Sequence, residues 1–363
     1  MSERQAWAAN RLGLDYRAEA ARLGPPTVPI VDVHVHLNGR GAAAIYDEAA
    51  TLFGVRRSYT QSQRATAHDV RDVLGERVRF IATPDYMAED KAHAFTDGFL
   101  ESMRWWHGEF GARMVKFWVA PRLKDFAGEA FEGIKLDGVW KRKAAELARE
   151  LGMMLMTHVA DPDTWFQTAY ADSSFYGTKR DQYAPLERML SDYSDVPWLA
   201  AHMAGSPEDL DFLDGLLERH ANLHLDTSAT KWQVRELSKH EPERLRAFFE
   251  RWRGRVLFGT DIVTQEAHLS VTDDVGFSST QATNAEEAFE LYASRFWAMR
   301  QLIEGSYNGE SPIADPDLMK VQPETHDAMS APRLRGMGLA GPALEAVYAG
   351  ACEDLVERWY VCH

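Results

Sequence analysis

The sequence predicts an α/β protein whose core is a closed (β/α)8 barrel. Short apolar segments rich in β-branched residues alternate with amphipathic helical segments, and this alternation is typical of a parallel sheet. Eight strand segments can be recognised, and no glycine-rich phosphate-binding pattern follows any of them. A closed barrel is therefore favoured over an open, doubly wound sheet. We expect a single domain over residues 1–363, with the barrel core at about 28–265.

The predicted strands are apolar runs of strand length, most of them bounded by glycine, proline or a polar residue. They lie at 28–38, 55–60, 78–84, 112–119, 153–158, 196–202, 222–228 and 255–261. The helices expected between them lie near 42–53, 67–74, 89–109, 138–150, 182–193, 207–220 and 232–251. A helical lead-in is expected at 3–23, and a C-terminal extension over 284–363 with helices at 284–304 and 341–360 is expected outside the barrel. Residues 305–340 are rich in proline, glycine and methionine and are predicted to be irregular.

Composition and charge narrow the class of partner. The net charge of −15 argues against nucleic acid or an anionic membrane, because both attract basic surfaces. The two cysteines, Cys352 and Cys362, are too few for a disulfide framework, and no apolar run is long enough for a membrane span. The N-terminus has no apolar signal core. We expect a cytoplasmic protein that binds a small molecule.

The first strand segment, VPIVDVHVHLN at residues 28–38, contains a His-x-His pair. Side chains alternate across a strand, which predicts Ile30, Asp32, His34 and His36 on one face and Val31, Val33, Val35 and Leu37 on the other. Two imidazoles on one face can reach a single cation. With 13 histidines in the chain such a pair also arises by chance, so further ligands are needed.

Three later strand segments end in residues that could be those ligands. His158, His202 and Asp261 each close a predicted strand after an apolar run. In a (β/α)8 barrel the carboxyl ends of the strands surround one site, so these side chains should meet the histidine pair. Imidazole nitrogen and carboxylate oxygen both bind Zn²⁺ well. The pattern therefore predicts a metal site at this end of the barrel.

The motifs resemble the amidohydrolase superfamily, in particular its branch of metal-dependent hydrolases and decarboxylases that includes aminocarboxymuconate semialdehyde decarboxylase. The resemblance rests on VDVHVHL (31–37), MVKFW (114–118), MTHVADP (156–162), LAAHMAG (199–205), LHLDTSA (223–229) and VLFGTD (256–261). The segment 339–359 is similar to the helix that closes these proteins, although Gly350-Ala351-Cys352 replaces the usual Gly-Asn-Ala.

The resemblance implies one divalent transition metal bound by four side chains: His34, His36, His158 and Asp261. The metal is expected to be zinc, with manganese or cobalt as alternatives. His202 would polarise the substrate or the metal-bound water, or transfer a proton, and Asp261 would also accept a proton. Members of this branch are often homodimers, so a homodimer is expected here.

Lys116 leaves a second metal arrangement open. In two-metal members of the superfamily a carboxylated lysine bridges the ions, and His158 and His202 would then hold the second metal. A one-metal site is favoured, because the lysine on this strand is usually not carboxylated in the branch that the chain resembles.

Other residues are expected to contact substrate or support the ligands. The candidates for substrate binding are Lys116, Trp118, Trp165 and Arg122, and the candidates for support are Asp32 and Asp226. Weaker candidates of the same two kinds are Phe166, Asp161, Lys231 and Ser228.

The expected function is that of a metal-dependent hydrolase acting on a small carboxylate-bearing or aromatic molecule through metal-activated water. The alternative is a metal-dependent, non-oxidative decarboxylase of a small aromatic or unsaturated acid, because the same ligands serve both reactions. A non-catalytic barrel is a third hypothesis, which the intact ligand set disfavours.

Overall fold

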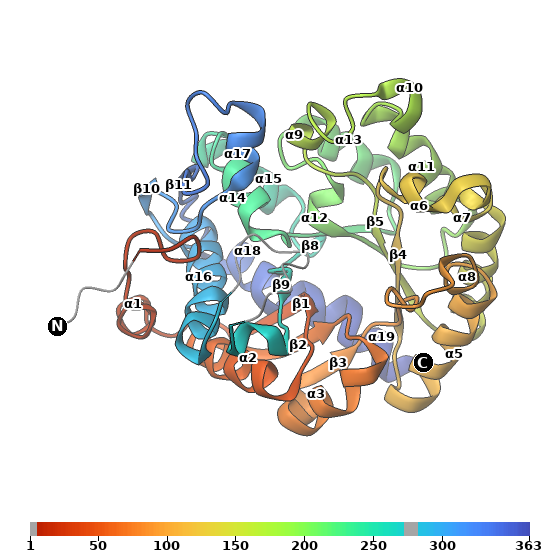
Figure 1. Cartoon of the computed structure of the whole chain (residues 1–363), viewed down its shortest axis with the longest axis horizontal. Coiled ribbons are helices and arrows are strands. Elements are labelled where there is room, and N and C mark those ends of the chain that lie inside the picture. The colour runs from red at the N-terminus through yellow and green to blue at the C-terminus, as the bar shows by residue number, and fades with distance from the viewer. Residues whose placement is uncertain (1–5, 272–281) are drawn as a thin grey trace.

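The computed structural model describes residues 6–271 and 282–363, in which parallel strands alternate with helices (Figure 1). The barrel strands are β1 (Ile30–His36), β2 (Val55–Thr60), β3 (Val78–Phe80), β4 (Met114–Trp118), β5 (Met154–His158), β6 (Trp198–Ala200), β7 (Leu223–Asp226) and β8 (Val256–Leu257). Each lies within a segment predicted from the sequence. Neighbours in this order pair in parallel within two groups, β1 to β3 and β4 to β8.

Hydrogen bonds at two seams close these groups into one barrel. A bridge between Ala82 and Val115 joins the strand segment of β3 to β4. On the other side, Val33 N donates to Phe258 O at 2.9 Å, and Asp261 N donates to His34 O at 2.8 Å. Strand β9 (Ile262–Val263) continues this contact along β1. The predicted (β/α)8 barrel, a TIM-barrel fold, is confirmed.

The C-terminal helical segment closes one end of the barrel, and the expectation that it packs outside the barrel was wrong. It comprises α18 (Gly341–Glu345), two π-helical turns (Ala346–Gly350 and Glu353–Glu357) and α19 (Arg358–Cys362). Cys352 and Val356 share one apolar cluster with Met154, Leu199 and other buried strand residues. The apolar face of this segment therefore plugs the barrel at the end opposite the polar strand termini.

Strand β1 does not keep the uniform alternation that the sequence predicts. Val31 and Val33 belong to the cluster that the C-terminal segment covers, whereas Val35 and Leu37 belong to the larger cluster around the barrel. The pairing of β1 with β2 shifts register between Asp32 and Val35, which changes the face that successive side chains occupy. His34 lies within this irregularity and His36 directly beyond it.

Most of the surrounding helices lie in the predicted segments, but two short helices between residues 123 and 134 lie where none was predicted. The surrounding helices are α2 (Arg40–Leu52), α3 (Ala67–Leu74), α4 (Lys91–Ala94), α5 (Asp97–Phe110), α6 (Leu123–Ala127), α7 (Phe131–Ile134), α8 (Val139–Glu150), α11 (Tyr183–Asp192), α13 (Leu210–Arg219), α14 (Thr230–Leu237), α15 (Pro242–Arg251) and α16 (Ala285–Ile303). Short 3₁₀ turns lie at Arg64–Thr66, Gly75–Arg77, Gly128–Ala130, Arg180–Gln182 and Glu266–Leu269. The segments 89–109 and 232–251 each form two helices instead of one.

Two helices begin later than the sequence predicts. The N-terminal helix α1 (Tyr16–Leu23) begins at the Asp15 cap, whose carboxylate accepts hydrogen bonds from Arg17 N and Ala18 N. Residues 6–14 form a non-helical arm, and residues 3–5 of the predicted lead-in lie outside the described part. Helix α13 begins after Asp209, whose side chain bonds Phe212 N, and not at the Ser206-Pro207 pair. In both cases a local carboxylate cap sets the start.

Two segments for which no helix or strand was predicted contain short elements at the carboxyl end of the barrel. The loop after β5 contains α9 (Asp163–Phe166) and α10 (Ser173–Tyr176), and residues 305–340 contain α17 (Pro316–Val321) between β10 (Asn308–Glu310) and β11 (Arg333–Arg335). Asp317 joins them, because its Oδ2 accepts hydrogen bonds from Trp165 Nε1 at 2.9 Å and Thr164 Oγ1 at 3.1 Å. The C-terminal extension is thereby tied to the β5 loop.

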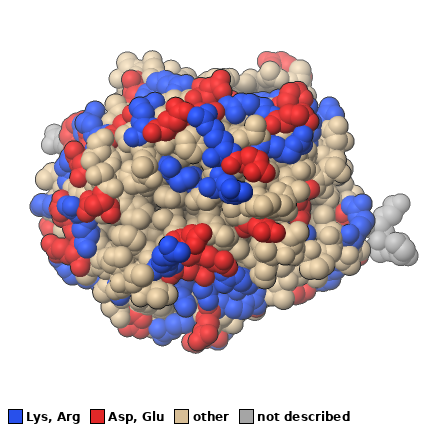
Figure 2. All heavy atoms as spheres, turned by 180° about the vertical axis from the view of Figure 1, so that it is seen from behind, with Lys and Arg blue, Asp and Glu red and all other residues tan. Residues whose placement is uncertain are grey.

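On the molecular face shown in Figure 2, basic and acidic side chains are interspersed rather than separated by sign. Among the described residues, every helix is too short or too polar to cross a membrane.

Candidate metal centre

The polar residues at the carboxyl ends of the strands converge at one end of the barrel. Strand β1 supplies His34 and His36, β4 supplies Lys116, β5 supplies His158, β7 supplies Asp226, and the turns after β6 and β8 supply His202 and Asp261. The structure thus brings side chains from six strand ends to one place.

Three of these side chains form a group with the geometry of a metal site. His36 Nε2 lies 3.1 Å and His34 Nε2 lies 3.5 Å from Asp261 Oδ1. Ligand atoms about 2.0–2.2 Å from one metal ion are separated by roughly 3.0–3.5 Å, so the three atoms match the edges of a coordination shell. The side chains of His36 and Asp261 are 28% and 26% exposed, whereas His34 is buried. These residues fit a divalent cation that is reached from the open side.

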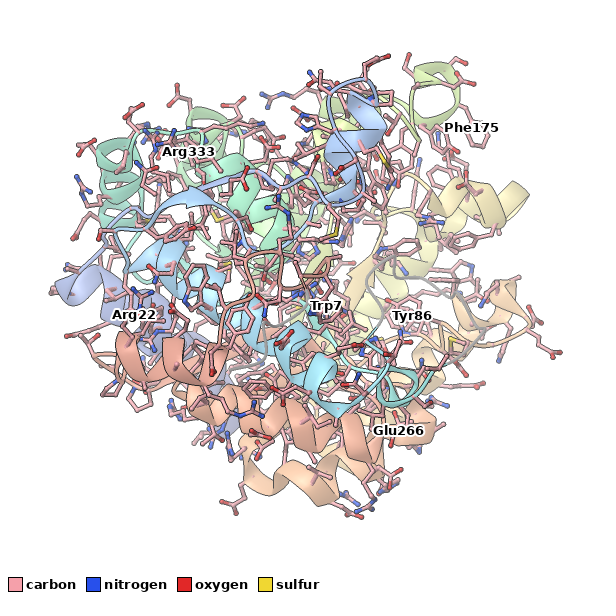
Figure 3. The ribbon with its side chains drawn as sticks, turned by 60° about the vertical axis from the view of Figure 1, so that its left-hand side comes forward. Trp7, Arg22, Tyr86, Phe175, Glu266 and Arg333 are labelled. Carbon is pink, nitrogen blue, oxygen red and sulfur yellow. The ribbon has the colours of Figure 1, made fainter. Side chains whose placement is uncertain are left out.

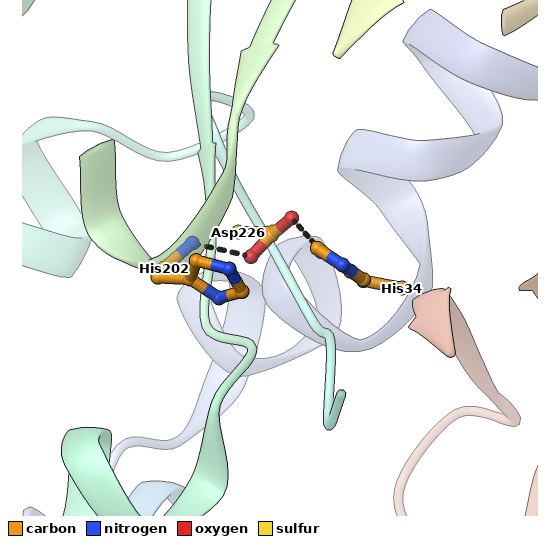
Figure 4. Close-up of side chains that lie close together, drawn as sticks. All are labelled: His34, His202 and Asp226. Carbon is orange, nitrogen blue, oxygen red and sulfur yellow. Dashed lines mark hydrogen bonds and ion pairs between the residues drawn. The ribbon is translucent and has the colours of Figure 1, made fainter. Parts of the chain in front are cut away.

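A buried network fixes the orientation of the His34 ring (Figure 4). Asp226 Oδ2 lies 3.0 Å from His34 Nδ1, and Ser228 Oγ lies 2.9 Å from the same nitrogen. A carboxylate can only accept, so His34 Nδ1 carries the proton and Nε2 keeps its lone pair for a cation. His34, His202 and Asp226 also lie within ligand distance of one another, but hydrogen bonds between these atoms and Ser228 account for that group.

His202 is held by the same network on the far side of Asp226. Its backbone N donates to Asp226 Oδ1 at 2.9 Å, and its Nδ1 lies 2.8 Å from Ser228 Oγ. The Ser228 hydroxyl itself donates to Asp226 Oδ1, so it accepts from His202 Nδ1 and leaves His202 Nε2 unprotonated. Burial lowers the pKa of His202 well below its usual value. A neutral imidazole with a free Nε2 can accept a proton or a hydrogen bond.

Strained backbone conformations are concentrated at this end of the barrel. His202, Met203 and Ala204 form a left-handed turn (α12, Ala201–Ala204), with φ values of 58°, 53° and 51°. Asp261 also has a positive φ of 61°. L-residues with a Cβ rarely occupy this region, and such strain is commonly retained where it positions functional groups. The turn directs the His202 backbone toward Asp226.

Three carboxylates of the centre have different environments. Burial would raise the pKa of Asp261, but the hydrogen bond from His36 and the charge of His34 outweigh it, so the pKa is well below its usual range. Burial would also raise the pKa of Asp226, but the charge of His34 and its hydrogen bond outweigh burial and lower that pKa. For Asp32 burial dominates and raises the pKa to about 8. Its oxygens bond His34 N, Thr260 N and Thr260 Oγ1, so it fixes backbone rather than an imidazole.

Lys116 lies beside the ligand group. Its Nζ is 3.5 Å from His34 Nε2, and the residue is 2% exposed. Among the described residues, no carboxylate oxygen lies within 4.0 Å of this amine. Burial lowers the pKa of Lys116 to about 8, although Asp226 and Asp261 act in the opposite direction. The ammonium is therefore the main form at pH 7.

His158 was predicted as a fourth ligand, and it lies outside the group formed by His34, His36 and Asp261. Its Nε2 is 2.9 Å from Asp161 Oδ1, and Asp161 Oδ2 accepts a 2.7 Å hydrogen bond from Tyr170. The His158 ring centroid is 4.9 Å from that of His202. In this conformation Nδ1 is the His158 nitrogen that remains for a metal, and its role as a ligand stays a prediction.

Aromatic side chains surround the centre, and two of them were not predicted. The Trp118 ring centroid lies 6.4 Å from that of His158, and Trp118 stacks on Phe126. Trp232, which follows the β7 motif, lies 6.1 Å from the His202 ring, and its buried Nε1 has no hydrogen-bond partner among the described residues. Trp165 instead uses its Nε1 to bind Asp317.

Arg122 and Tyr170 lie close to each other in the structure. Arg122 lies near Tyr170, where its charge partly offsets the increase in the pKa of Tyr170 that burial and Asp161 cause. Tyr170 itself was missed, because nothing in the loop sequence indicates that its hydroxyl reaches Asp161.

Asp226→Asn tests the supporting network. The amide has the size of the carboxylate but lacks its charge, so it holds the His34 tautomer less firmly. We expect metal affinity to fall about 10–100-fold, the usual effect of removing such a supporting carboxylate. Competition with a chromophoric chelator would measure it, and Asp172→Asn at the exposed cap of α10 is the control. An unchanged dissociation constant for Asp226→Asn would contradict the assigned role.

A family model described as "Amidohydrolase" matches residues 10–290, which include every element of the centre described above. The chain belongs to the amidohydrolase family. The motif resemblance on which the sequence interpretation relied is therefore confirmed over most of the chain. No curated protein matched the sequence.

Several solved structures are similar to this amidohydrolase-family chain at low identity. An uncharacterized TIM-barrel protein from Bordetella bronchiseptica is 11% identical, with a TM-score of 0.45 over 91% of this chain and 99% of the other. The 5-carboxyvanillate decarboxylase of Novosphingobium aromaticivorans, solved with manganese and a nitrobenzoic acid, is 12% identical. Its TM-score is 0.40, over 76% of this chain and 98% of the other. Metarhizium anisopliae IDCase in apo form is 14% identical, with a TM-score of 0.41 over 89% of this chain and 80% of the other.

Proposed function

We propose that this protein is a metal-dependent enzyme that releases CO₂ from a small carboxylic acid. His34 Nε2, His36 Nε2 and Asp261 Oδ1 would hold one divalent metal ion, with His158 as the fourth protein ligand. Two imidazoles and a carboxylate suit zinc, and manganese and cobalt accept the same donors. The bound cation would polarise an oxygen of the substrate.

The observation that carries the proposal is the buried Lys116 ammonium beside the ligand group. It lies 3.5 Å from His34 Nε2 and has no carboxylate partner within 4.0 Å among the described residues. A cation next to a divalent metal is unfavourable in a buried site unless an anion joins them. A substrate carboxylate placed between the two would supply that anion. This arrangement puts the carboxylate itself at the reacting centre, which favours decarboxylation.

The remaining residues can pass to carbon a proton taken up from water, because Asp261 and His202 are both unprotonated at rest. Decarboxylation breaks the carbon–carboxylate bond, releases CO₂ and leaves an electron pair on carbon that must take a proton. Asp261 Oδ1 faces the histidines, so Oδ2 is the oxygen of that carboxylate available to carry a proton. His202 Nε2 is the other candidate atom. Trp118 and Trp232 provide apolar surface for a planar substrate.

Hydrolysis remains the second candidate, supported by the state of His202. Its neutral imidazole with an unprotonated Nε2 is suited to accept a proton from water, and Asp261 is a second acceptor. A hydrolase would use the same metal ligands. A screen of aromatic carboxylates, amides and lactones, scored separately for CO₂ and for hydrolysis products, distinguishes the two. Hydrolysis without CO₂ release would overturn the decarboxylase proposal.

Lys116→Met tests the role of the ammonium. The variant keeps the length of the side chain and removes the charge, so we expect KM for a carboxylic acid substrate to rise about 10-fold or more, the value of one charge-assisted hydrogen bond. Thermal stability should not fall, because a buried unpaired cation is removed. The exposed Lys143→Met variant on α8 is the control. A KM unchanged in Lys116→Met would remove the main support for a carboxylate at the metal.

A further inference from the structure

Two basic residues near the mouth of the barrel have no acidic partner in the described part of the chain. Arg295 of α16 is partly buried, and its Nη1 donates to Leu291 O and Ser294 Oγ, both at 2.8 Å. No carboxylate oxygen of the described residues lies within 4.0 Å of the guanidinium. Burial lowers the pKa of Arg295 to about 10, so it remains charged at neutral pH.

Lys231 is the second member of the pair. It is the second residue of α14, is partly buried, and forms no hydrogen bond or ion pair with the described residues. Helices α14 and α16 contact each other, and the charge of Arg295 adds to burial in lowering the pKa of Lys231, so the two cations lie within electrostatic range. The acidic groups nearest to them are engaged elsewhere: Asp315 pairs with Arg235, and Asp317 binds Trp165.

The other groups that face Arg295 are neutral. They are Tyr16, Tyr292 and His268, and the pKa of His268 is lowered to about 4 by burial and then by Arg295. His268 Nδ1 lies 2.8 Å from the Tyr292 hydroxyl. On the same helix, Glu290 accepts a 2.7 Å hydrogen bond from Trp7 of the N-terminal arm (Figure 3). Among the described residues, the surroundings of Arg295 therefore supply hydrogen-bond donors but no carboxylate within 4.0 Å.

The pair is tied to the metal centre through its neighbours in sequence. Thr230, directly before Lys231, donates from Oγ1 to Thr260 O at 2.9 Å, and Thr260 precedes the ligand Asp261. Trp232, directly after Lys231, packs beside His202. Lys231 thus belongs to the segment that connects the ends of β7 and β8 at the mouth of the barrel.

We propose that Arg295 and Lys231 bind a second carboxylate of the substrate, so that the substrate is a dicarboxylic acid with one carboxylate at the metal. This inference rests on the proposed function for the role of the first carboxylate. Guanidinium groups bind carboxylates through two parallel hydrogen bonds, and a second cation adds attraction. Partial exposure of both side chains leaves the pair accessible to a ligand, and an arriving carboxylate supplies the missing counter-charge.

Isothermal titration of the full chain tests the pair with isophthalate, benzoate and inorganic phosphate as probes. We expect isophthalate to bind metal-loaded protein at least 10-fold more tightly than benzoate does, and this preference to disappear in Lys231→Met and Arg295→Met. Lys231 has no hydrogen bond or ion pair with the described residues to lose, so its variant should fold even if Arg295→Met does not. Lys143→Met is the matched control and should keep the preference. Equal preference in Lys231→Met and the control would overturn the inference.

A metal-ligand variant separates this inference from the proposed function. In Asp261→Asn, benzoate should still bind at Arg295 and Lys231, and adding Lys231→Met should weaken that binding at least 10-fold. Binding that is lost with Asp261 alone would contradict an independent carboxylate site. Tighter binding of phosphate than of either carboxylate would contradict the substrate class. If these bindings follow expectation but no CO₂ is released from any acid, the proposed function fails and the anion site stands.

Discussion

Replacing Asp261 with asparagine is expected to remove most of the bound metal and to lower kcat/KM by about 10³-fold, a typical effect of losing a group that transfers a proton. Asp261 brings Oδ1 to 3.1 Å from His36 Nε2, and its side chain is 26% exposed. The amide is a weaker ligand and cannot exchange a proton at neutral pH. Both losses act on the same reaction.

The Asp261→Asn variant should also change metal binding and proton transfer without disturbing the fold. Asp261 has a φ of 61°, and asparagine tolerates the left-handed region better than most residues, so the backbone should keep its conformation. Metal analysis, steady-state kinetics and thermal unfolding would be measured together, with Asp172→Asn as the control. Full metal occupancy and near-normal turnover in Asp261→Asn would show that Asp261 is neither a ligand nor a proton carrier.

The second large effect is expected at Lys141, far from this chemistry. Lys141 is fully buried on α8, its Nζ has no hydrogen-bond partner among the described residues, and Phe99 and Phe117 lie 4.6 and 5.6 Å from it. Burial lowers its pKa from 10.5 to about 7. The unfolded chain therefore binds a proton that the folded chain lacks between these two pH values.

The direction of the pH effect follows from that difference. Stability rises with pH where the unfolded state binds more protons, so Lys141 destabilises the fold at pH 7 and this penalty disappears as pH approaches 10.5. Lys141→Met should raise the free energy of unfolding by roughly 2–5 kcal/mol at pH 7, given about 1.4 kcal/mol per pKa unit. The gain should be much smaller near pH 10.

Urea unfolding at several pH values would measure this effect. Lys143→Met, an exposed position on the same helix, is the control and should change stability little at any pH. A loss of stability in Lys141→Met would show that the phenylalanine rings stabilise the amine. A gain that does not vary with pH would contradict the lowered pKa of Lys141.

The barrel could be predicted because its strands carry a local signal. The strands β5 and β7, for example, are short apolar runs that each end in a polar residue. Parallel pairing of such strands in a barrel then determines where the polar residues meet. The irregularity of β1 after Asp32 could not be predicted, because it depends on pairing with β2 and on the Thr260 contacts. The plug formed by Val356 and Cys352 depends on packing between distant segments.

The same distinction applies to the centre. His34, His36 and Asp261 were recognisable because each sits at a strand end. Asp226 and, as a weaker candidate, Ser228 were also predicted from their place at a strand end. The left-handed turn that brings the His202 backbone to Asp226 could not be predicted, because no residue type in it indicates a positive φ. Arg295 lies in a helix more than thirty residues beyond the last barrel strand, and only the fold brings it near Lys231. Long-range placement of this kind has no local signature.

The metal content of protein purified without chelator tests the central claim most directly. Elemental analysis of the folded chain should find about one transition-metal ion per chain, and His36→Ala should lose it while remaining folded. Two ions per chain, with a carboxyl group on Lys116, would contradict the one-metal arrangement. A fully folded protein that contains no metal and takes up none from zinc, manganese or cobalt solutions would contradict the metal centre itself.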